Sequence, residues 1–469
     1  MRYSITLSEE HSIELRTLLI KEDEYERSAI LLCGRSIIID DIWDGGSEER
    51  LFSYMVIPIK DSEIISNSQT SVNWKTDTFI KAIKIAEEQN LAVCLVHNHP
   101  NNILTYSKID DENEPDLIKT IFNRNGGDRV HASLVITPKG DIFGRVWTKH
   151  LNSHPFSMIR VIGKRFQFYY PNKHSLIDRE IFDRQQLAFG KALNNDLSKL
   201  KIGVIGCGAT GSATANLLSR IGVGQLLLID NDIVERSNLS RLHGPTAGDA
   251  DAGRAKVEAL RDSITNAGIG TRVRVIKDWV GSEKCREAIK SSDILFGCTD
   301  DDAGRIFLNR FSHFYFIPTF DMGIVIEPSK DDPTSLSALQ GRLTIIFPGN
   351  TCLICRDVVN IRLAAEEHLK RNDPMGYERQ KDEAYVIGAR NPSPAVITFT
   401  TEVATMAVNE LINRITGFKK NGAENNIMRF FDRSEDGKPG AVKRPECPIC
   451  SKTNYWGKGD TVPFLDQAN

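Results

Sequence analysis

The sequence predicts an α/β protein with two folded domains: an α+β domain, followed by a doubly wound, mostly parallel sheet. Over residues 1–150, short apolar runs alternate with polar segments, as in a domain built on a sheet. Beyond residue 180, strand-like and helix-like segments alternate in the βαβ manner. The 469 residues suffice for roughly two to four domains, each with its own core.

The composition is that of a globular protein, with 41% hydrophobic and 26% charged residues. The chain has 59 Lys and Arg against 62 Asp and Glu, a net charge of -3, so no overall basic field attracts phosphate backbones. We therefore expect no nucleic-acid partner. The first residues lack a secretory signal pattern, and no apolar run approaches the ~20 residues that span a bilayer. We expect a cytoplasmic protein with no membrane partner.

In the first domain, residues 1–150, one stretch near 79–90 has a helical pattern, and the strands are predicted at AILLCG, YMVIPI, AVCLVH, ASLVIT and IFGRVW. Residues 151–180 mix basic, aromatic and turn residues without a clear period, which predicts a linker. The second domain is predicted over 181–469. Its strands are KIGVIG, QLLLID, RVRVIK and DILFGC, and its helices are SATANLLSRIG and AKVEALRDSITNAG.

A glycine-rich turn follows the first strand of the second domain. Gly206, Gly208 and Gly211 form a GxGxxG pattern, which lets backbone N–H groups approach a phosphate at the start of a helix. Asp230 ends the next strand, where an acidic residue would bind a ribose hydroxyl. On these residues alone, an NAD-dependent dehydrogenase is the first alternative.

The residues that follow favour a triphosphate instead. A cationic clamp stabilises charge on a pyrophosphate leaving group, and carboxylates are suitable ligands for Mg²⁺. Charged and amide side chains of these kinds come at or after the predicted strand ends, namely Asp232, Asn238, Arg241, Lys256 and Asp300.

Together these motifs resemble the ubiquitin-activating and ThiF/MoeB/HesA adenylyltransferase family. The similarity spans about residues 180–451 and includes the glycine turn, the DxDxVxxSNLxR run, a downstream Lys and a C-T-D step. It implies a Rossmann-like domain that uses ATP and Mg²⁺. The resemblance implies that Asp230 holds the ribose and that Asp232 also lies in the nucleotide site. It further implies that Asp300 holds Mg²⁺ and that the phosphates are held by Asn238, Arg241 and Lys256. The family's first helix is similar to residues 182–190, which implies a homodimer with Arg184 as an arginine finger.

Four of the nine cysteines form two CxxC pairs, Cys352 with Cys355 and Cys447 with Cys450. This spacing lets two thiolates of each pair share one tetrahedral Zn²⁺, and a closed set of four predicts a structural ion. The adenylating family carries the same two pairs.

Many members of that family also have a nucleophilic cysteine after the first pair, but no cysteine lies between Cys355 and Cys447 here. Ser393 or Thr398 would be a poor substitute, because an unactivated hydroxyl is a far weaker nucleophile than a thiolate. We therefore expect the chemistry to stop at the acyl-adenylate, with transfer to a separate acceptor such as a conjugating-type enzyme.

A second constellation, His97, His99, Ser107 and Asp110, follows the predicted strand LAVCLV. Two histidines at i and i+2 and an aspartate make a three-ligand zinc site, which leaves a position for water. The pattern resembles the JAB/MPN (JAMM) metalloprotease motif over residues 1–150. The resemblance implies a glutamate as general base, either Glu26 or, failing that, Glu24, and Ser107 as a donor to the oxyanion.

Both resemblances point to the carboxyl end of a ubiquitin-like protein. The metalloprotease part would trim a precursor or remove the modifier from conjugates, and the sequence does not choose between these. Three alternatives stay open: activation of a sulfur-carrier protein, adenylation of a short peptide, and a non-catalytic scaffold.

Overall fold

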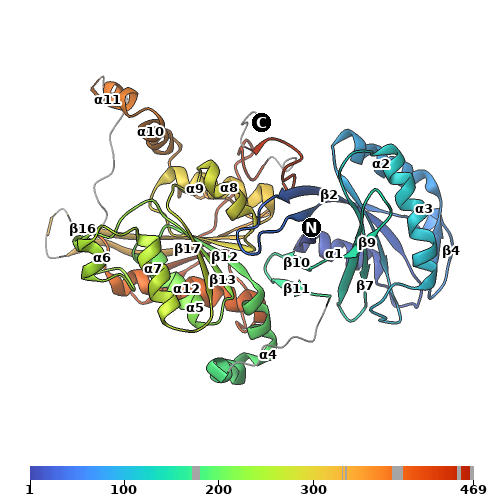
Figure 1. Cartoon of the computed structure of the whole chain (residues 1–469), viewed down its shortest axis with the longest axis horizontal. Helices are drawn as coiled ribbons and strands as arrows, with labels where there is room; N and C mark the ends of the chain where they lie inside the picture. Colours follow the sequence, from blue (N-terminus) through green and yellow to red (C-terminus); the bar gives the residue numbers. More distant parts are fainter. Residues whose placement is uncertain (172–179, 330, 333–334, 383–393, 452–455, 465–469) are drawn as a thin grey trace. The chain divides into compact units, whose positions relative to one another are not determined.

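Two large β-sheets, one in each of two units, organise the chain in the computed structural model (Figure 1). The first unit comprises Met1–His174, Phe314–Phe316 and Asn454–Asn469, and the second comprises Ser175–His313 and Ile317–Thr453. The structure describes residues 1–171, 180–329, 331–332, 335–382, 394–451 and 456–464.

The first unit is built on a nine-stranded mixed sheet in the order β11-β10-β1-β3-β2-β6-β7-β8-β9. The strands are β1 (Arg2–Ser8), β2 (Ser28–Ile38), β3 (Glu48–Pro58), β6 (Ala92–Asn98), β7 (His131–Ile136), β8 (Ile142–Trp147), β9 (Ser153–Pro155), β10 (Met158–Ile162) and β11 (Gln167–Tyr169). A separate hairpin pairs β4 (Ile64–Asn67) with β5 (Val72–Trp74). The helices are α1 (Glu9–Leu19), α2 (Thr76–Glu88) and α3 (Lys108–Arg124).

Apolar side chains on both faces of this sheet create two cores. Leu31 and Cys33 of β2 point to the face covered by α1, while the alternate residues Ile30 and Leu32 pack with α2 and α3. Because side chains alternate along a strand, a fully apolar strand such as LAVCLV supports helices on both sides. The sequence predicts α2 but no helix over the residues of α1 or α3.

The predicted linker over 151–180 is wrong for residues 153–169. β10 pairs in parallel with β1, and β9 and β11 extend the two edges of the same sheet. Ile159, Val161 and Ile162 are each at most 3% exposed, so this segment contributes to the core. The basic and aromatic residues around β10 hid a five-residue strand whose apolar residues are nearly continuous.

The second unit contains an eight-stranded sheet in the order β14-β13-β12-β15-β16-β17-β18-β19. Pairing is parallel from β14 to β16 and antiparallel beyond, so the predicted doubly wound, mostly parallel sheet is confirmed. The strands are β12 (Lys201–Ile205), β13 (Gln225–Ile229), β14 (Arg272–Ile276), β15 (Ile294–Gly297), β16 (Thr319–Pro328), β17 (Leu336–Ile346), β18 (Asn426–Phe430) and β19 (Glu435–Gly437).

Helices cover both faces of this second sheet. Figure 1 shows α5 (Ala209–Arg220), α7 (Lys256–Asn266) and α12 (Ile397–Thr416) on one face, and α8 (Glu283–Lys290) and α9 (Asp302–Tyr315) on the other. The remaining helices are α4 (Asp183–Lys199), α6 (Ala247–Asp251), α10 (Ile361–Asn372) and α11 (Pro374–Asp382). In such a sheet the strand order reverses between β12 and β15, and ligands bind at the carboxyl ends of strands beside that point.

The predicted domain over 181–469 also needs a correction at its far end, because Asn454–Asn469 belongs to the first unit. Gly459 forms a parallel bridge with Arg35, and the Asp460 N–H donates to the Arg35 carbonyl at 2.7 Å. The Asp460 carboxylate accepts from the Ser36 hydroxyl at 2.9 Å. The polar residues of this segment gave no sequence signal for pairing with a strand more than 400 positions earlier.

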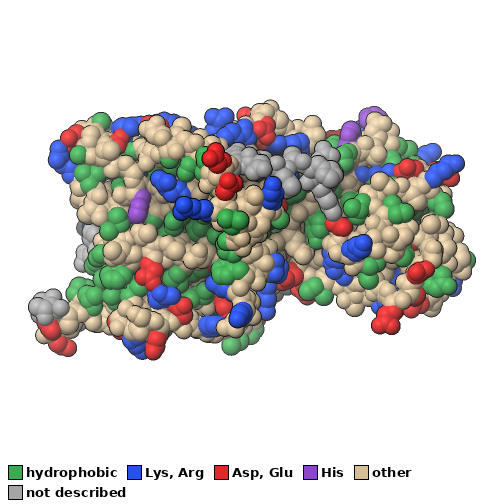
Figure 2. All heavy atoms as spheres, turned by 90° about the horizontal axis from the view of Figure 1, so that it is seen from below, with side chains coloured by type: hydrophobic (Ala, Val, Ile, Leu, Met, Phe, Trp, Pro, Cys, Tyr) green, Lys and Arg blue, Asp and Glu red, His purple; other side chains and the backbone are tan. Residues whose placement is uncertain are grey.

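Among the residues that the structure describes, every helix is too short or too polar to span a bilayer. Basic and acidic side chains are interspersed on the face drawn in Figure 2.

Candidate functional site

A cavity of about 490 Å³ in the second unit lies at the carboxyl ends of its parallel strands. It is lined by residues that follow β12, β13, β14 and β15, and by residues of β16. This is the region where an open α/β sheet binds ligands. The glycine turn forms part of the lining, through Gly206 and Gly208.

Each position of the turn has a different structural relation to its glycine. Gly206 has φ +86°, and a Cβ there would lie 2.9 Å from the Cys298 backbone. A Cβ on Gly211 would collide with the Gly206 carbonyl oxygen, so this glycine lets α5 pack closely on the turn. Gly208 is the N-cap of α5 and has open space around it. The turn therefore offers bare backbone to a ligand at the start of a helix.

Asp230 follows β13 and faces the same cavity. Its carboxylate accepts hydrogen bonds from the N–H groups of Cys207, at 2.6 Å, and Asp232, at 2.8 Å. Burial raises its pKa, and the nearby Lys256 acts against that rise. Lys256 also forms an ion pair with Asp232 at 2.6 Å. The carboxylate therefore fixes the glycine turn and the next loop relative to each other.

The structure brings most of the predicted nucleotide residues together, but not all. Asp230, Asp232, Arg241, Lys256 and Asp300 line the cavity with Gly206 and Gly208. Asn238 does not line it; this residue is buried, and its amide donates to the Ser237 hydroxyl at 3.2 Å. Arg184 lies on α4, exposed and outside the lining.

Trp279 and Arg371 are among the lining residues that the sequence does not indicate. Trp279 follows β14, and its indole N–H donates to Asp301 at 3.0 Å. The Arg371 guanidinium of α10 stacks over the Trp279 ring at 3.8 Å and pairs with Asp301 at 3.4 Å. The position of Trp279 just after a strand could have indicated a site residue. Arg371 lies on a helix far along the chain, and no local pattern marks it.

The four cysteines of the two CxxC pairs are buried, and their sulfur atoms all lie within 4.8 Å of one another. Sγ of Cys352 is 3.5 Å from that of Cys447, and the same distance separates Cys355 from Cys450. A tetrahedral ion with Zn–S bonds of about 2.3 Å requires sulfur separations of roughly 3.8 Å. Burial acts to raise the Cys447 pKa, but N–H groups of Cys450 and Ile449 lower it to about 7. The set fits a closed zinc site.

The candidate catalytic metal group lies in the first unit. His97 and His99 come from the end of β6 and the residue after it, and Asp110 lies in the first turn of α3. The two histidine Nε2 atoms are 3.2 Å apart, and the Asp110 oxygens lie 3.4 Å from His97 and 3.5 Å from His99. Zn–N and Zn–O bonds of about 2.0–2.2 Å in a tetrahedron give edges of roughly 3.3–3.6 Å. The two imidazole nitrogens and the Asp110 carboxylate therefore converge as three ligands of one metal ion would, which leaves a fourth position of a tetrahedral site.

The protonation states and hydrogen bonds of His97, His99 and Asp110 favour metal binding. Burial lowers the pKa of His97 to about 4, so its imidazole is neutral at physiological pH, as metal binding requires. His99 Nδ1 lies 2.9 Å from the Ile103 carbonyl, which favours a proton on Nδ1 and a free lone pair on Nε2. Burial opposes ionisation of Asp110, yet the hydrogen bond with His99 and the other polar contacts outweigh it and lower the Asp110 pKa.

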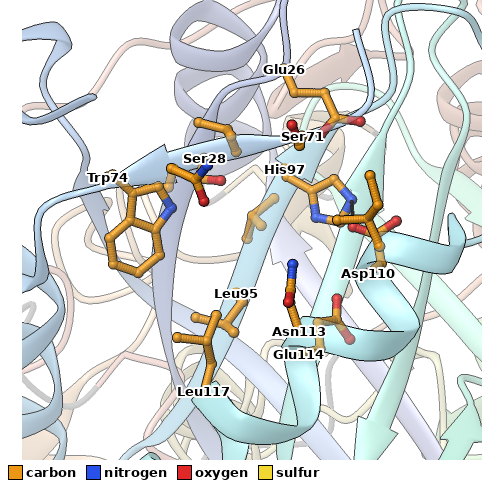
Figure 3. A pocket seen from close by; sticks show the side chains of 15 residues that line it. Glu26, Ser28, Ser71, Trp74, Leu95, His97, Asp110, Asn113, Glu114 and Leu117 are labelled. Carbon is orange, nitrogen blue, oxygen red and sulfur yellow. Dashed lines mark ion pairs between the residues drawn. The ribbon is translucent and has the colours of Figure 1, made fainter. Parts of the chain in front are cut away.

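Glu26 lines a cavity of about 90 Å³ together with His97 and Asp110 (Figure 3). It is 3% exposed, and no described residue forms a hydrogen bond with its carboxylate. Burial raises its pKa to about 7; Asp110 adds to the rise and His99 opposes it. The fallback, Glu24, is exposed and bonded to Gln69. Glu26 therefore has the surroundings that a general base needs.

Ser107 is the N-cap of α3. Its hydroxyl accepts from the Asp110 N–H at 3.1 Å, and the Asp110 carboxylate accepts from the Ser107 N–H at 2.7 Å. This capping box fixes a metal ligand, a role that the sequence interpretation did not give to Ser107.

Of the two poor substitutes for the absent nucleophile, Ser393 lies outside the described residues. Thr398 is exposed in the first turn of α12 and does not line the cavity.

Residues 182–449, more than half of the chain, match the ThiF family. The chain is 27% identical over 157 residues to the SAMP-activating enzyme E1 of Haloferax volcanii, 33% of this chain and 52% of that protein. It is 27% identical over 228 residues to ubiquitin-like modifier-activating enzyme 5 of Aedes aegypti, covering 45% and 54%. The molybdopterin-synthase adenylyltransferase of Escherichia coli is 29% identical over 141 residues, covering 28% and 55%. The chain spans about half the length of these curated relatives.

Proposed function

Because the chain belongs to the ThiF family, we propose that its second unit uses ATP to adenylate the terminal carboxylate of a ubiquitin-like protein. We propose further that its first unit is a zinc-dependent peptidase that cleaves after that terminus. The observation that carries the first part is the cavity at the strand ends, where the glycine turn and several cations converge.

In the adenylation site, the bare turn at Gly206 and Gly208 would receive phosphate oxygens through backbone N–H groups. Arg241 and Lys256 would neutralise the phosphates, and Asp230 would hold the ribose. Mg²⁺, held by Asp300, would supply charge neutralisation at the leaving pyrophosphate. A substrate carboxylate oxygen attacks the α-phosphorus, the bond to pyrophosphate breaks, and an acyl-adenylate forms.

The acyl-adenylate would be passed to a separate acceptor, because no cysteine lies between Cys355 and Cys447. A conjugating-type enzyme with its own thiolate is the proposed acceptor. Zinc held by Cys352, Cys355, Cys447 and Cys450 would supply only structural closure, since four thiolates leave no open position.

The same adenylation proposal includes a homodimer. Arg184 lies on α4, whose helical geometry is interrupted at Gly190 with φ +79°. Beside it, Leu187 is 88% exposed and Ile181 is 63% exposed. Apolar side chains exposed on one short segment support contact with another chain. We propose that the partner subunit covers them and receives Arg184 near its phosphates.

For the peptidase, zinc held by His97, His99 and Asp110 would supply Lewis-acid activation of water. Glu26 would accept a proton from the attacking water and deliver one to the leaving amine. The Ser107 hydroxyl would donate to the developing oxyanion. The amide C–N bond breaks, the water oxygen enters the new carboxylate, and the amine takes the proton. The observation that carries this proposal is the convergence of two imidazole nitrogens and a carboxylate, beside the buried Glu26.

A sulfur-carrier protein is a second candidate substrate for the adenylating unit. The observation in its favour is that a molybdopterin-synthase adenylyltransferase matches this chain as well as the ubiquitin-type activating enzymes do, at 29% against 27% identity. A requirement for a sulfur donor in product formation would support this candidate.

ATP–pyrophosphate exchange with purified ubiquitin-like and sulfur-carrier proteins tests the adenylation. We expect exchange that depends on one such protein and is lost in Asp300→Ala. Exchange driven by none of them would contradict the proposal.

Incubating the zinc-loaded chain with a tailed precursor and with an isopeptide-linked conjugate tests the cleavage. Hydrolysis of only one substrate would assign the peptidase to processing or to deconjugation.

A further inference from the structure

We infer that the first unit carries a binding pocket for an uncharged apolar side chain of the segment that leaves on cleavage, an inference that rests on the proposed peptidase function. The pocket is a cavity of about 350 Å³ lined by the loop that precedes Ser107 and by β8, β9, β10 and β11. Its volume lies within the usual range for ligand pockets, which are mostly apolar with a few polar groups.

Most of the lining side chains are apolar or aromatic, and Thr105, Arg145 and Ser153 are the exceptions. Ile142, Phe156 and Ile159 are each at most 3% exposed and form the floor. The rings of Tyr106 and Phe143 contribute walls, and Leu104, 42% exposed, stands at the rim. A side chain entering here would leave water for an apolar surface, which stabilises by about 25 cal/mol per Å² buried.

The pocket adjoins the metal ligands. The Tyr106 ring lies 6.3 Å from the His97 ring in an edge contact, and the Phe143 ring lies 5.8 Å from the His99 ring. Tyr106 and Phe143 also contact each other, with centroids 5.4 Å apart. Only the rings of Tyr106 and Phe143 therefore separate this pocket from a substrate bound at the His97, His99 and Asp110 group.

The pocket wall is held before any ligand binds. The Tyr106 hydroxyl donates to the Ser133 carbonyl at 3.0 Å, and the Arg145 guanidinium stacks on the Tyr106 ring at 3.7 Å. Arg145 in turn donates to the buried Glu114 carboxylate at 2.9 Å. A preformed wall reduces the ordering cost of binding.

The same contacts determine which side chains are accepted. The charge of Arg145 is already paired with Glu114 and Asp111, so the guanidinium offers little to an acidic side chain. An acidic or strongly hydrated group would lose water without gaining a partner. The pocket therefore favours residues such as Leu and Phe.

The sizes of these two cavities suggest which side of the cleaved bond each one binds. The cavity that contains Glu26, His97 and Asp110 has about 90 Å³ and shares no lining residue with the apolar pocket. So small a space suits a chain end without side chains, such as consecutive glycines. The larger pocket is left for the first residues after the cleaved bond.

The test uses the full-length chain loaded with zinc and ubiquitin carrying four-residue tails that begin with Gly, Asp, Leu or Phe. We expect kcat/KM for Leu and Phe tails to exceed that for Gly and Asp tails at least tenfold. Leu104→Asp should remove this preference, while Ile80→Asp on α2 should keep it. Ile80 is 50% exposed and lines neither cavity, which makes it a matched control.

A binding measurement separates the inference from the proposed function. Fluorescence anisotropy of labelled tail peptides on Glu26→Gln should show at least fivefold tighter binding for Leu than for Gly, lost in the added Leu104→Asp. Cleavage of all tails at equal rates, with equal binding of all peptides, would overturn the pocket and leave the peptidase standing. Absence of cleavage with every tail would overturn the peptidase and with it the inference.

Discussion

The four cysteines of the second unit and the His97, His99 and Asp110 group of the first unit both fit a tetrahedral ion, but they differ in closure. The cysteines supply all four ligands from two pairs whose facing members are 95 positions apart, and each thiol is at most 6% exposed. The other group supplies three ligands and faces a cavity that also contains Glu26. The number of ligands, rather than the metal, thus distinguishes a structural site from a catalytic one.

The two groups also differ in how much a bound ion would stabilise the folded chain. An ion shared by the cysteine pairs would fix a long loop, and loop closure is worth more as the loop grows. The three residues of the open group lie within 14 positions of each other, at a strand end and a helix start, where the sheet already places them. We therefore expect metal loss to destabilise the fold around the four cysteines, and to abolish activity without unfolding at the group of His97, His99 and Asp110.

The largest expected effect is the loss of the closed site. Cys447→Ser removes a thiolate from a set whose zinc binding is worth on the order of 10 kcal/mol in small zinc domains. We expect one zinc fewer per chain and a fall of more than ~10 °C in the unfolding temperature of the second unit, measured by calorimetry with metal analysis. Cys285→Ser is the control, since Cys285 is buried in the same unit outside the cluster. Equal stability of the two variants would contradict the structural role.

The next effect is the loss of the open site. His99→Ala should reduce cleavage on the order of 10³-fold, because a metal lowers the pKa of bound water from about 16 to about 7. The unfolding temperature should fall by only a few degrees. Metal analysis should find the closed site still loaded. His150→Ala, at an exposed histidine outside the group, should behave as wild type. Unfolding of the first unit by His99→Ala would remove the contrast between the two sites.

A third effect concerns Glu26 in the zinc-free protein. Its pKa is raised to about 7 in the folded chain, mainly by burial, against about 4.3 unfolded. Between these values the folded state holds a proton that the unfolded state has lost, so stability is full below about pH 4.3 and declines as pH rises to 7. We expect the free energy of unfolding to fall by about 1–3 kcal/mol between pH 5 and pH 8, and this fall to be absent in Glu26→Gln. Urea unfolding of both proteins at the two pH values measures it. Parallel pH profiles for the two proteins would contradict it.

The smallest effect concerns Ser107. Ser107→Ala removes the N-cap of α3, which costs about 1 kcal/mol, and loosens Asp110. Loss of such supporting contacts typically weakens metal binding 10–100-fold. Zinc affinity and unfolding temperature should both recover in Ser107→Thr, which keeps the capping oxygen. Unchanged zinc affinity in Ser107→Ala would show that the cap does not position the ligand.

The residues that sequence patterns identified are those with local signals. The glycine turn, the strand ends and the CxxC pairs each reveal themselves within a few positions, and the structure places them as expected. Arg371, Tyr106 and Arg145 were missed because their roles come from contacts between distant elements. The strand at 158–162 and the pairing of Asp460 with β2 were missed for the same reason. Contacts at long range leave no periodic pattern for a single sequence to reveal.

Two independent sites in one chain are the central proposal, and a comparison of two variants tests it most directly. Cleavage of a tailed ubiquitin-like substrate and ATP–pyrophosphate exchange are measured on Glu26→Gln and on Asp300→Ala. We predict that Glu26→Gln loses cleavage at least 100-fold and keeps exchange within twofold, and that Asp300→Ala does the reverse. Loss of both activities in either variant, or of neither in both, would contradict the account.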